Sequence, residues 1–353
     1  MTKPMTGRTS LPGHRESQQS RMQRVSVSEE QLDTAQWIAL TQKDGVAIGE
    51  GHAKTILIGE HSVVYGKPAI AVPVTSLRTV ARIEPQPGSP ILFALDGDII
   101  SIDELPDRFA SIAEATTVSL DYFGLPKEGI LVRLRSGIPP AAGLGGSSAV
   151  AHAVVEAVRD FADGTLTEQQ RFDLVQAAER VAHGKSSGLD ASASRAQRPV
   201  YFYQGRMSPL QVGAPMWLVL GDTGVRGSTS DAVARVRGFV DSHRVRGAEL
   251  LDELAQLTQA SVKYLARGDV ERLGRRLNQA QRALDELRVG HESITELVRA
   301  ARAAGAAGAK LTGAGCGGCV LALTDSADRA RLIRHAMTDA NAVATWIVEV
   351  NPT

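Results

Sequence analysis

Short apolar runs rich in β-branched residues follow one another between residues 45 and 95. Runs of four to eight such residues, separated by polar or glycine-containing positions, are typical of β-strands. The pattern predicts strands at residues 46–48, 55–58, 69–74, 79–83 and 91–95. The beginning of the fold is therefore expected to be a sheet.

Helical periodicity takes over in the middle of the chain. One predicted helix begins with Thr167-Glu168-Gln169-Gln170, the arrangement of a capping box. It is predicted at 167–182. The other predicted elements are helices at 107–123 and 147–162, strands at 130–134, 200–203 and 217–220, a mostly helical stretch to 302, and strands at 319–323 and 346–350 around a helix at 328–337. Strands first and mixed helices later predict an α+β protein in two lobes.

The predicted lobes are residues 45–205 and 206–353, with the boundary at Gln204-Gly205-Arg206. Residues 1–44 differ from both, because they are rich in Ser, Gln and Arg and have almost no apolar periodicity. A segment of this composition cannot bury enough apolar surface to fold, so a disordered N-terminal extension is predicted.

Composition excludes several classes of function. Lys and Arg together number 39, as do Asp and Glu, so no bulk charge attracts nucleic acid or an anionic membrane. Aromatic residues make up 4% of the chain, too few for a surface that stacks bases. No apolar run reaches the ~18 residues of a membrane span. With Cys316 and Cys319 as the two cysteines, a reducing compartment, the cytoplasm, is expected.

The first glycine-bearing segment is Gly51 to Gly66. Lys54 enters an apolar strand there, and the strand leaves through Gly59 into Glu60-His61. A charged residue at the start of a strand is usually a solvated edge. Here polar groups stand at both ends of one buried strand, and the residues alone leave the functional and the structural interpretation open.

The second segment runs from Ile138 to Ala149 and contains Gly143-Leu144-Gly145-Gly146-Ser147-Ser148. Its glycines allow close approach of the backbone, and its serines precede a predicted helix. A glycine-rich loop at a helix N-terminus offers free N–H groups and the positive end of the helix dipole to a phosphate. An ordinary N-cap needs fewer small residues, so the pattern favours phosphate binding.

The third segment, Ala309 to Cys319, has four glycines within residues 313–318. A tight β-turn needs one or two. The excess predicts a backbone that passes close to a ligand or to another part of the chain.

Two acids complete the set of candidates. Phosphoryl transfer needs a metal to bridge phosphate oxygens, a cation to balance developing charge and a carboxylate to orient or deprotonate the hydroxyl. Glu179 with a loop serine can supply the first, Lys54 the second and Asp190 the third. Each acid also has a plain interpretation, because Glu179 can pair on a helix surface and Asp190 can cap a helix.

Together these segments resemble the GHMP kinase family over roughly residues 46–350. Residues 143–149 are similar to its ATP-binding motif and residues 310–318 to its C-terminal glycine motif. The resemblance implies a two-lobed GHMP kinase fold, with an N-terminal mixed-sheet lobe, a C-terminal α/β lobe and the ATP site between them.

Within the family, residues 54–66 and 183–190 look like the mevalonate kinases, as does the position of Glu179 eleven residues before Asp190. This implies ATP-dependent phosphorylation of mevalonate to 5-phosphomevalonate, in the mevalonate route to isoprenoids. ATP, Mg²⁺ and mevalonate are the expected ligands, and a homodimer is left open. Other GHMP small-molecule kinases, such as phosphomevalonate kinase or homoserine kinase, and a non-catalytic ligand-binding member are the alternatives.

The resemblance also implies residue roles. Asp190 would be the base or orienter of the acceptor hydroxyl, and Lys54 would lower the pKa of that hydroxyl and stabilise transferring charge. Ser148 and Glu179 would hold Mg²⁺. The residues expected around ATP are Pro140, Gly143, Leu144, Gly145, Gly146, Ser147, Ser148 and Ala149, and those expected on the substrate side are Glu60, His61, Thr229, Gly313 and Ala314.

Two departures from the family pattern leave questions open. The extra glycine of Gly145-Gly146 leaves open whether Ser147 or Ser148 ligates the metal, and Cys316 stands where the family usually has glycine. A phosphorylated acceptor would need further cations, for which Arg78, Arg195 and Arg226 are candidates.

Overall fold

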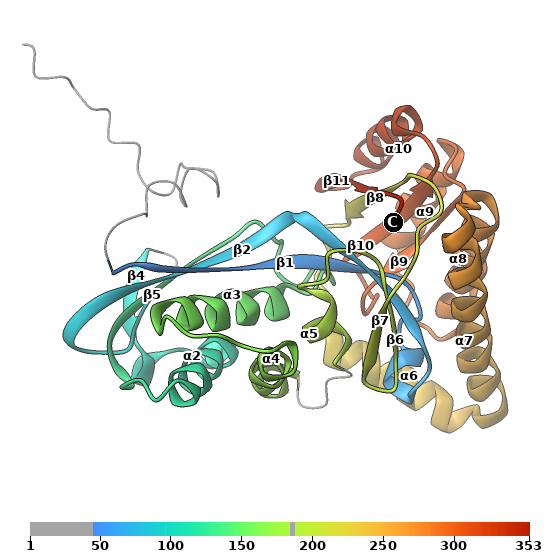
Figure 1. Ribbon diagram of the computed structural model, residues 1–353. Coiled ribbons are helices and arrows are strands. Elements are labelled where there is room, and N and C mark those ends of the chain that lie inside the picture. The colour runs from blue at the N-terminus through green and yellow to red at the C-terminus, as the bar shows by residue number, and fades with distance from the viewer. Residues whose placement is uncertain (1–44, 96, 184–187) are drawn as a thin grey trace, which may run out of the picture.

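The structure is a computed structural model that describes residues 45–95, 97–183 and 188–353. The predicted extension, residues 1–44, lies outside this range. Residues 184–187, which belong to the family-like segment 183–190, also lie outside it. The described residues form two sheets with helices packed on them (Figure 1).

The first sheet has seven strands in the order β4-β3-β5-β2-β6-β7, with β1 paired to β2. All its pairings are antiparallel except that of β3 with β5. The strands are β1 (Ala47–Ile58), β2 (Ala69–Pro90), β3 (Leu92–Leu95), β4 (Asp98–Ser101), β5 (Glu128–Ser136), β6 (Val200–Tyr203) and β7 (Arg206–Pro209).

Long strands replace pairs of predicted short ones. The predictions at 46–48 and 55–58 are parts of β1, and those at 69–74 and 79–83 are parts of β2, which has 22 residues. The polar positions Thr75 and Ser76, which interrupt the apolar pattern, lie in β2 where the β1–β2 register shifts. A β-bulge changes the side-chain alternation without ending the strand.

The second sheet has four strands in the order β11-β8-β10-β9, all antiparallel. They are β8 (Met216–Asp222), β9 (Gly308–Thr312), β10 (Cys319–Thr324) and β11 (Ala344–Val350). The glycines of the third segment form the connection between β9 and β10. The predicted boundary after residue 205 falls in the turn between β6 and β7, and the first sheet continues to Pro209.

Helices pack on both sheets, and helix α3 lies between the first sheet and two other helices. Figure 1 shows α3 lying along β1 and β2, with α2 and α4 on its far side, and α8 beside β9 with α7 packed against it. The helices are α2 (Ala110–Tyr122), α3 (Gly146–Phe161), α4 (Glu168–His183), α5 (Leu189–Ala193), α6 (Thr229–Ser242), α7 (Arg244–Arg267), α8 (Val270–Glu286), α9 (Glu292–Ala303) and α10 (Ala327–Asp339), with short 3-10 turns η2 (Ser62–Tyr65), η3 (Ile102–Glu104) and η4 (Asp107–Phe109).

Glycines in β1 let α3 approach the strand closely. A Cβ atom on Gly49 or Gly51 would lie 2.1 Å from a backbone oxygen of α3. Because side chains cannot occupy that space, glycine is required at both positions. The close contact fixes the start of α3 against β1, where the candidate site begins.

One apolar core joins the two sheets. Leu57 and Ile70 of the first sheet belong to the same buried cluster as Leu220 and Leu321 of the second. A second cluster lies between the first sheet and α2, α3 and α4. Among the described residues, no helix combines the length and apolar character needed to cross a membrane.

Candidate active site

The structure places Lys54 beside Asp190. The Lys54 Nζ atom on β1 lies 3.0 Å from Oδ1 of Asp190 on α5, and the exposed fractions of the two side chains are 2% and 35%. Gly188, with φ +84°, precedes α5 and turns the chain into it. A buried cation therefore meets a carboxylate that remains accessible to a ligand.

The second glycine segment wraps around this lysine. The backbone N–H of Lys54 donates to the carbonyl of Leu144 at 2.9 Å, and its Nζ donates to the carbonyl of Gly143 at 3.5 Å. Gly145, the N-cap of α3, has φ +73°, and a Cβ there would lie 2.8 Å from Cε of Lys54. Glycine at 145 is thus needed for both its conformation and the lysine beside it.

The third glycine segment meets the second, backbone against backbone. A Cβ on Gly313 would lie 2.8 Å from the Cα of Gly143. The Thr312 hydroxyl accepts from the N–H of Ile56 at 2.9 Å and donates to its carbonyl at 3.0 Å. The predicted close approach of this segment to another part of the chain is present, and it ties β9 to β1.

His61 sits in a γ-turn at the exit of β1. Its φ of +59° and ψ of −48° are rare for a residue with a side chain, and the Ser62 N–H donates to the Glu60 carbonyl at 2.6 Å. Burial lowers the pKa of His61 to about 4, so the imidazole is neutral at pH 7. Its Nε2 donates to the carbonyl of Ala314 at 2.8 Å, which unites two predicted substrate-side residues.

Glu60 is buried and forms an ion pair with Lys310, a residue that the sequence analysis did not assign to the site. The carboxylate of Glu60 accepts a hydrogen bond from Lys310 Nζ, and both side chains have an exposed fraction of 0%. Burial raises the pKa of Glu60 and lowers that of Lys310, while each partner counteracts the shift of the other. Since its side chain is fully buried, Glu60, which was predicted on the substrate side, pairs with Lys310 inside the protein.

Known families match the chain in the same regions. The family described as "GHMP kinases N terminal domain" matches residues 110–196, and "GHMP kinases C terminal" matches residues 261–343. A protein of Thermococcus sibiricus named mevalonate kinase is 37% identical over 292 residues, which cover 77% of this chain and 87% of that protein. A mevalonate kinase of Pyrococcus horikoshii is 36% identical over 298 residues, which cover 78% and 88%.

The chain belongs to the GHMP kinase family. Its fold agrees with that of L. major mevalonate kinase in complex with R-mevalonate, with a TM-score of 0.76, 25% identity and coverage of 87% of this chain and 96% of that one. Streptococcus pneumoniae phosphomevalonate kinase has the same fold, with a TM-score of 0.73 at 17% identity and coverage of 85% and 99%. The GHMP kinase fold predicted from the sequence is confirmed.

The two predicted metal ligands of this GHMP kinase lie on α3 and α4, which pack together. Ser148 is fully buried, and its Oγ has no hydrogen-bond partner among the described residues. Glu179 has an exposed fraction of 2%, and Ser147 is half-buried. A buried hydroxyl without a partner fits a ligand that is not protein, as a metal ion or phosphate is. The described residues contain no cluster of three or more His, Cys, Asp or Glu side chains that could hold a metal.

The remaining residues predicted for the site differ in how exposed their side chains are. Pro140 is exposed between β5 and α3, while Leu144 and Ala149 are buried in the core. Thr229 is the exposed first residue of α6. A Cβ on nearby Gly227 would lie 2.9 Å from the Gly315 carbonyl oxygen, so this segment borders the third glycine segment.

Cys316 of this GHMP kinase takes a conformation that favours glycine. Its φ is +57°, and its N–H donates to the Val289 carbonyl at 2.7 Å. The positive φ gives a physical reason why relatives usually have glycine there. The half-buried Cys316 side chain lies in the connection between β9 and β10, and its positive φ strains the backbone there.

Each of the three candidate arginines is already paired with a carboxylate. Arg78 lies 3.3 Å from Glu50, and Arg195 lies 2.9 Å from Glu156. Arg226 donates to both carboxylate oxygens of Asp222, at 2.6 and 2.8 Å. A second phosphate on the acceptor would have to compete with these carboxylates for the guanidinium groups.

Proposed function

We propose that this GHMP kinase is a mevalonate kinase, which transfers the γ-phosphoryl group of ATP to the primary hydroxyl of mevalonate. The observation that carries the proposal is the 3.0 Å contact of Lys54 with Asp190 beside the glycine loop at the N-terminus of α3. A carboxylate, a cation and a phosphate-binding loop are the parts that phosphoryl transfer to an alcohol requires.

Asp190 orients the acceptor hydroxyl and accepts its proton. Lys54 stabilises the alkoxide character that develops on that oxygen and the charge on the transferring phosphoryl group. Because Lys54 is almost fully buried, its charge acts in a medium of low dielectric, where electrostatic interactions are stronger than in water. Residues 143–147 bind the phosphates through backbone N–H groups at the start of α3.

Ser148 and Glu179 are the residues that would hold Mg²⁺ in this proposal. The buried, unpartnered hydroxyl of Ser148 supports that role. When bound, Mg²⁺ supplies positive charge to the phosphate oxygens during transfer.

The acceptor is proposed to lie against His61, Ala314 and Gly313. Relatives named mevalonate kinase cover most of the chain, which supports mevalonate as the acceptor. Arg78, Arg195 and Arg226, the candidate cations for a phosphorylated acceptor, each already pair with a carboxylate, and the acceptor assay below tests phosphomevalonate directly.

Both cysteines lie in the described part of the chain and are free thiols, which supports a cytoplasmic location. A homodimer stays a prediction from the family resemblance.

The test is a coupled assay of ADP release with mevalonate, phosphomevalonate, homoserine and galactose as acceptors, each with Mg²⁺ and ATP. Turnover is expected with mevalonate and at most weakly with the other three. Preference for phosphomevalonate or homoserine would assign a different kinase activity, and no turnover with any acceptor would support the non-catalytic alternative.

A further inference from the structure

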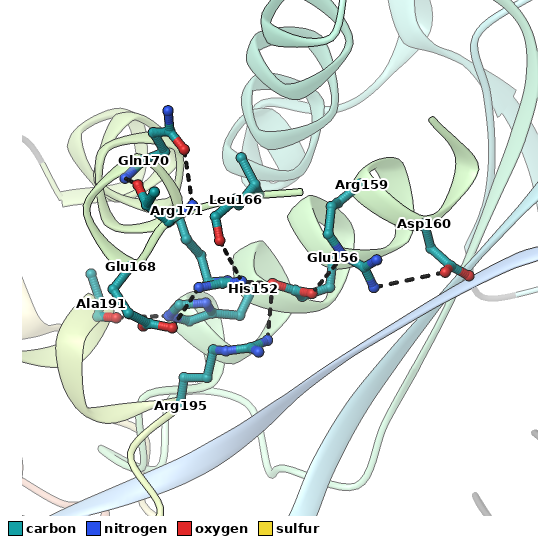
Figure 2. A network of polar contacts seen from close by, with 11 residues as sticks. His152, Glu156, Arg159, Asp160, Leu166, Glu168, Gln170, Arg171, Ala191 and Arg195 are labelled. Carbon is teal, nitrogen blue, oxygen red and sulfur yellow. Dashed lines mark hydrogen bonds and ion pairs between the residues drawn. The ribbon is translucent and has the colours of Figure 1, made fainter. Parts of the chain in front are cut away.

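Polar side chains on one face of α3 form a network that the proposed chemistry does not use (Figure 2). His152 and Glu156 are four residues apart and Arg159 follows three residues later, so they lie along one side of the helix. Figure 2 shows that side facing α4 and the segment around Ala191 and Arg195. The network therefore reaches the part of the chain that carries Asp190.

Glu156 is the centre of the network. Its side chain has an exposed fraction of 7% and pairs with three guanidinium groups: Arg171 through Nε, Arg159 through Nε at 3.0 Å and Arg195 through Nη1 at 2.9 Å. Burial alone would raise the pKa of Glu156, but the hydrogen bond from Arg171 and the three positive charges lower it by more. Glu156 is thus a buried carboxylate that stays ionised at neutral pH.

The three arginines connect Glu156 to different elements. Arg159 belongs to α3 itself, and Arg171 belongs to α4, where it also pairs with Glu168. Arg195 lies two residues after the end of α5. Of the three, Arg195 is the one that links α3 to the segment of Asp190.

His152 makes a second link to the same segment. Its Nε2 donates to the carbonyl of Ala191, the residue after Asp190, at 2.7 Å. Burial lowers the pKa of His152 to about 4, so the ring is neutral at pH 7 and the proton on Nε2 is the one that the carbonyl accepts. Two bonds from one face of α3 therefore reach this segment, one at the middle residue of α5 and one just after its C-terminal end.

External support matters for α5 because the helix is short. It has five residues, and a helix of that length is not stable on its own. At the N-terminus of α3, Gly145 and Gly146 join the helix to the loop that surrounds Lys54. The position of Asp190 relative to Lys54 and the loop is thus set partly through α3. The strand β1 also holds this segment directly, because the His52 N–H donates to the Ser194 carbonyl at 3.2 Å.

We propose that Glu156 and Arg195 are positioning residues, which hold α5 on α3 so that Asp190 stays at its distance from Lys54 and the phosphate loop. The inference rests on the role proposed for Asp190. Misplacement of a reacting group by about 1 Å can lower turnover roughly 10²-fold, so a looser α5 affects kcat more than the binding of ATP.

Arg159 offers a matched control for Arg195. Both donate to the Glu156 carboxylate, at 3.0 and 2.9 Å, and their side chains are similarly exposed, at 30% and 37%. They differ in that Arg159 stays within α3 whereas Arg195 crosses to the segment of α5. Arg195→Gln and Arg159→Gln each remove one arginine from the same carboxylate, so any difference between them reports the link to α5.

The experiment measures kcat, the KM values for ATP and mevalonate, and the thermal unfolding midpoint of the full chain and of both variants. Arg195→Gln is expected to lower kcat about tenfold or more, while its KM for ATP stays within about twofold. Arg159→Gln is expected to keep kcat within about twofold at a similar unfolding midpoint. Arg195→Lys, which keeps the charge, is expected to recover part of the lost kcat.

Equal kcat values for Arg195→Gln and Arg159→Gln would overturn the proposal, as would a loss of activity that merely follows the unfolding midpoint. If Arg195→Gln does not fold, Arg195→Lys and Arg159→Lys are compared by the same criteria. A wild-type chain that binds ATP but turns over no acceptor would contradict the proposed function instead, and the positioning role would fall with it.

Discussion

The ammonium group of Lys54 and the carboxylate of Asp190 are 3.0 Å apart, although 135 residues separate them in the sequence. One comes from a long strand and the other from a short helix, and the glycine loop at 143–146 closes around the lysine. An acceptor hydroxyl placed at Asp190 would therefore lie beside a fixed positive charge.

Asp190→Asn is expected to lower kcat by at least the ~10²-fold typical of a lost acid–base group, because the amide cannot accept the hydroxyl proton. ATP binding should change little, since the phosphates are bound by the loop. Single-turnover kinetics and ATP titration measure the two effects separately. Near-normal turnover would remove Asp190 from the proton transfer.

Gly145→Ala is expected to lower kcat about tenfold or more, because the new methyl group would displace Lys54 from its place. Gly205→Ala is the matched control: Gly205 has φ +74°, close to the +73° of Gly145, but no atom lies within 4 Å of its added Cβ. Both variants acquire the same backbone strain, and only Gly145→Ala crowds the lysine. Equal kcat values in the two variants would show that crowding at Lys54 has no effect.

Ser148→Ala is expected to raise the Mg²⁺ concentration needed for half-maximal activity by about tenfold, the lower end of the effect of losing a group that orients a metal site. Ser147→Ala should raise it less, because the Ser148 hydroxyl is the buried one without a partner in the described part of the chain. Initial rates measured over a series of Mg²⁺ concentrations compare the variants. The reverse order would assign the metal to Ser147.

Stability should fall as the pH falls from about 6.5 to about 4. Burial lowers the pKa values of His61 and His152 from 6.5 to about 4 in the folded chain. Between these two pH values the unfolded state therefore binds protons that the folded state does not bind, and protonation favours unfolding. Between pH 7.5 and pH 5, each histidine should lower the free energy of unfolding by about 2 kcal/mol.

His152→Gln should reduce the loss of unfolding free energy between pH 7.5 and pH 5 by about 2 kcal/mol, the contribution of one histidine. The exposed His335→Gln is the control and should leave the pH dependence close to that of the wild type. Urea unfolding at pH 7.5, 6 and 5 gives the free energies. An unchanged pH dependence in His152→Gln would mean that His152 does not contribute.

Lys310→Met should destabilise the chain by about 3–5 kcal/mol, because it leaves Glu60 as a buried carboxylate without its cation. Lys67→Met removes a cation from Asp252 at the surface, where such a pair contributes about 0–1 kcal/mol. Denaturant unfolding of the two variants compares them. A loss no larger in Lys310→Met than in Lys67→Met would show that Glu60 becomes protonated or hydrated at little cost.

Helices and loops could be predicted from local sequence more fully than strands. The periodicity at 147–162 gave α3 to within one residue at each end, since a buried helical face repeats within each turn. β7 was missed because all four of its residues are exposed, so it has no apolar alternation. The polar residues Thr75 and Ser76 interrupt the apolar pattern, so β2 was predicted as two strands. The apolar pattern reports which residues are buried and does not report which strands are paired.

In the candidate site, the glycine content of residues 313–318 predicted a close approach to a ligand or to another part of the chain, because such an approach requires the absence of side chains. The structure shows that the approach at Gly313 is to the backbone of Gly143, a partner that the glycine content did not identify. The partner of Glu60 could not be predicted in this way. Lys310 lies 250 residues further on, and pairing at that distance leaves no local pattern. A lysine inside the apolar run from Ala309 to Leu311 was the available signal, since a buried lysine needs an anion.

The same pair has a consequence for the order of events during synthesis. When the ribosome has released strands β1 and β2, Glu60 does not yet have Lys310 as its cation, because Lys310 is translated 250 residues later. Until β9 is synthesised, the Glu60 side chain has to stay hydrated or protonated. The turn that presents His61 is therefore completed among the last steps, and a fragment truncated before β9 should not retain it.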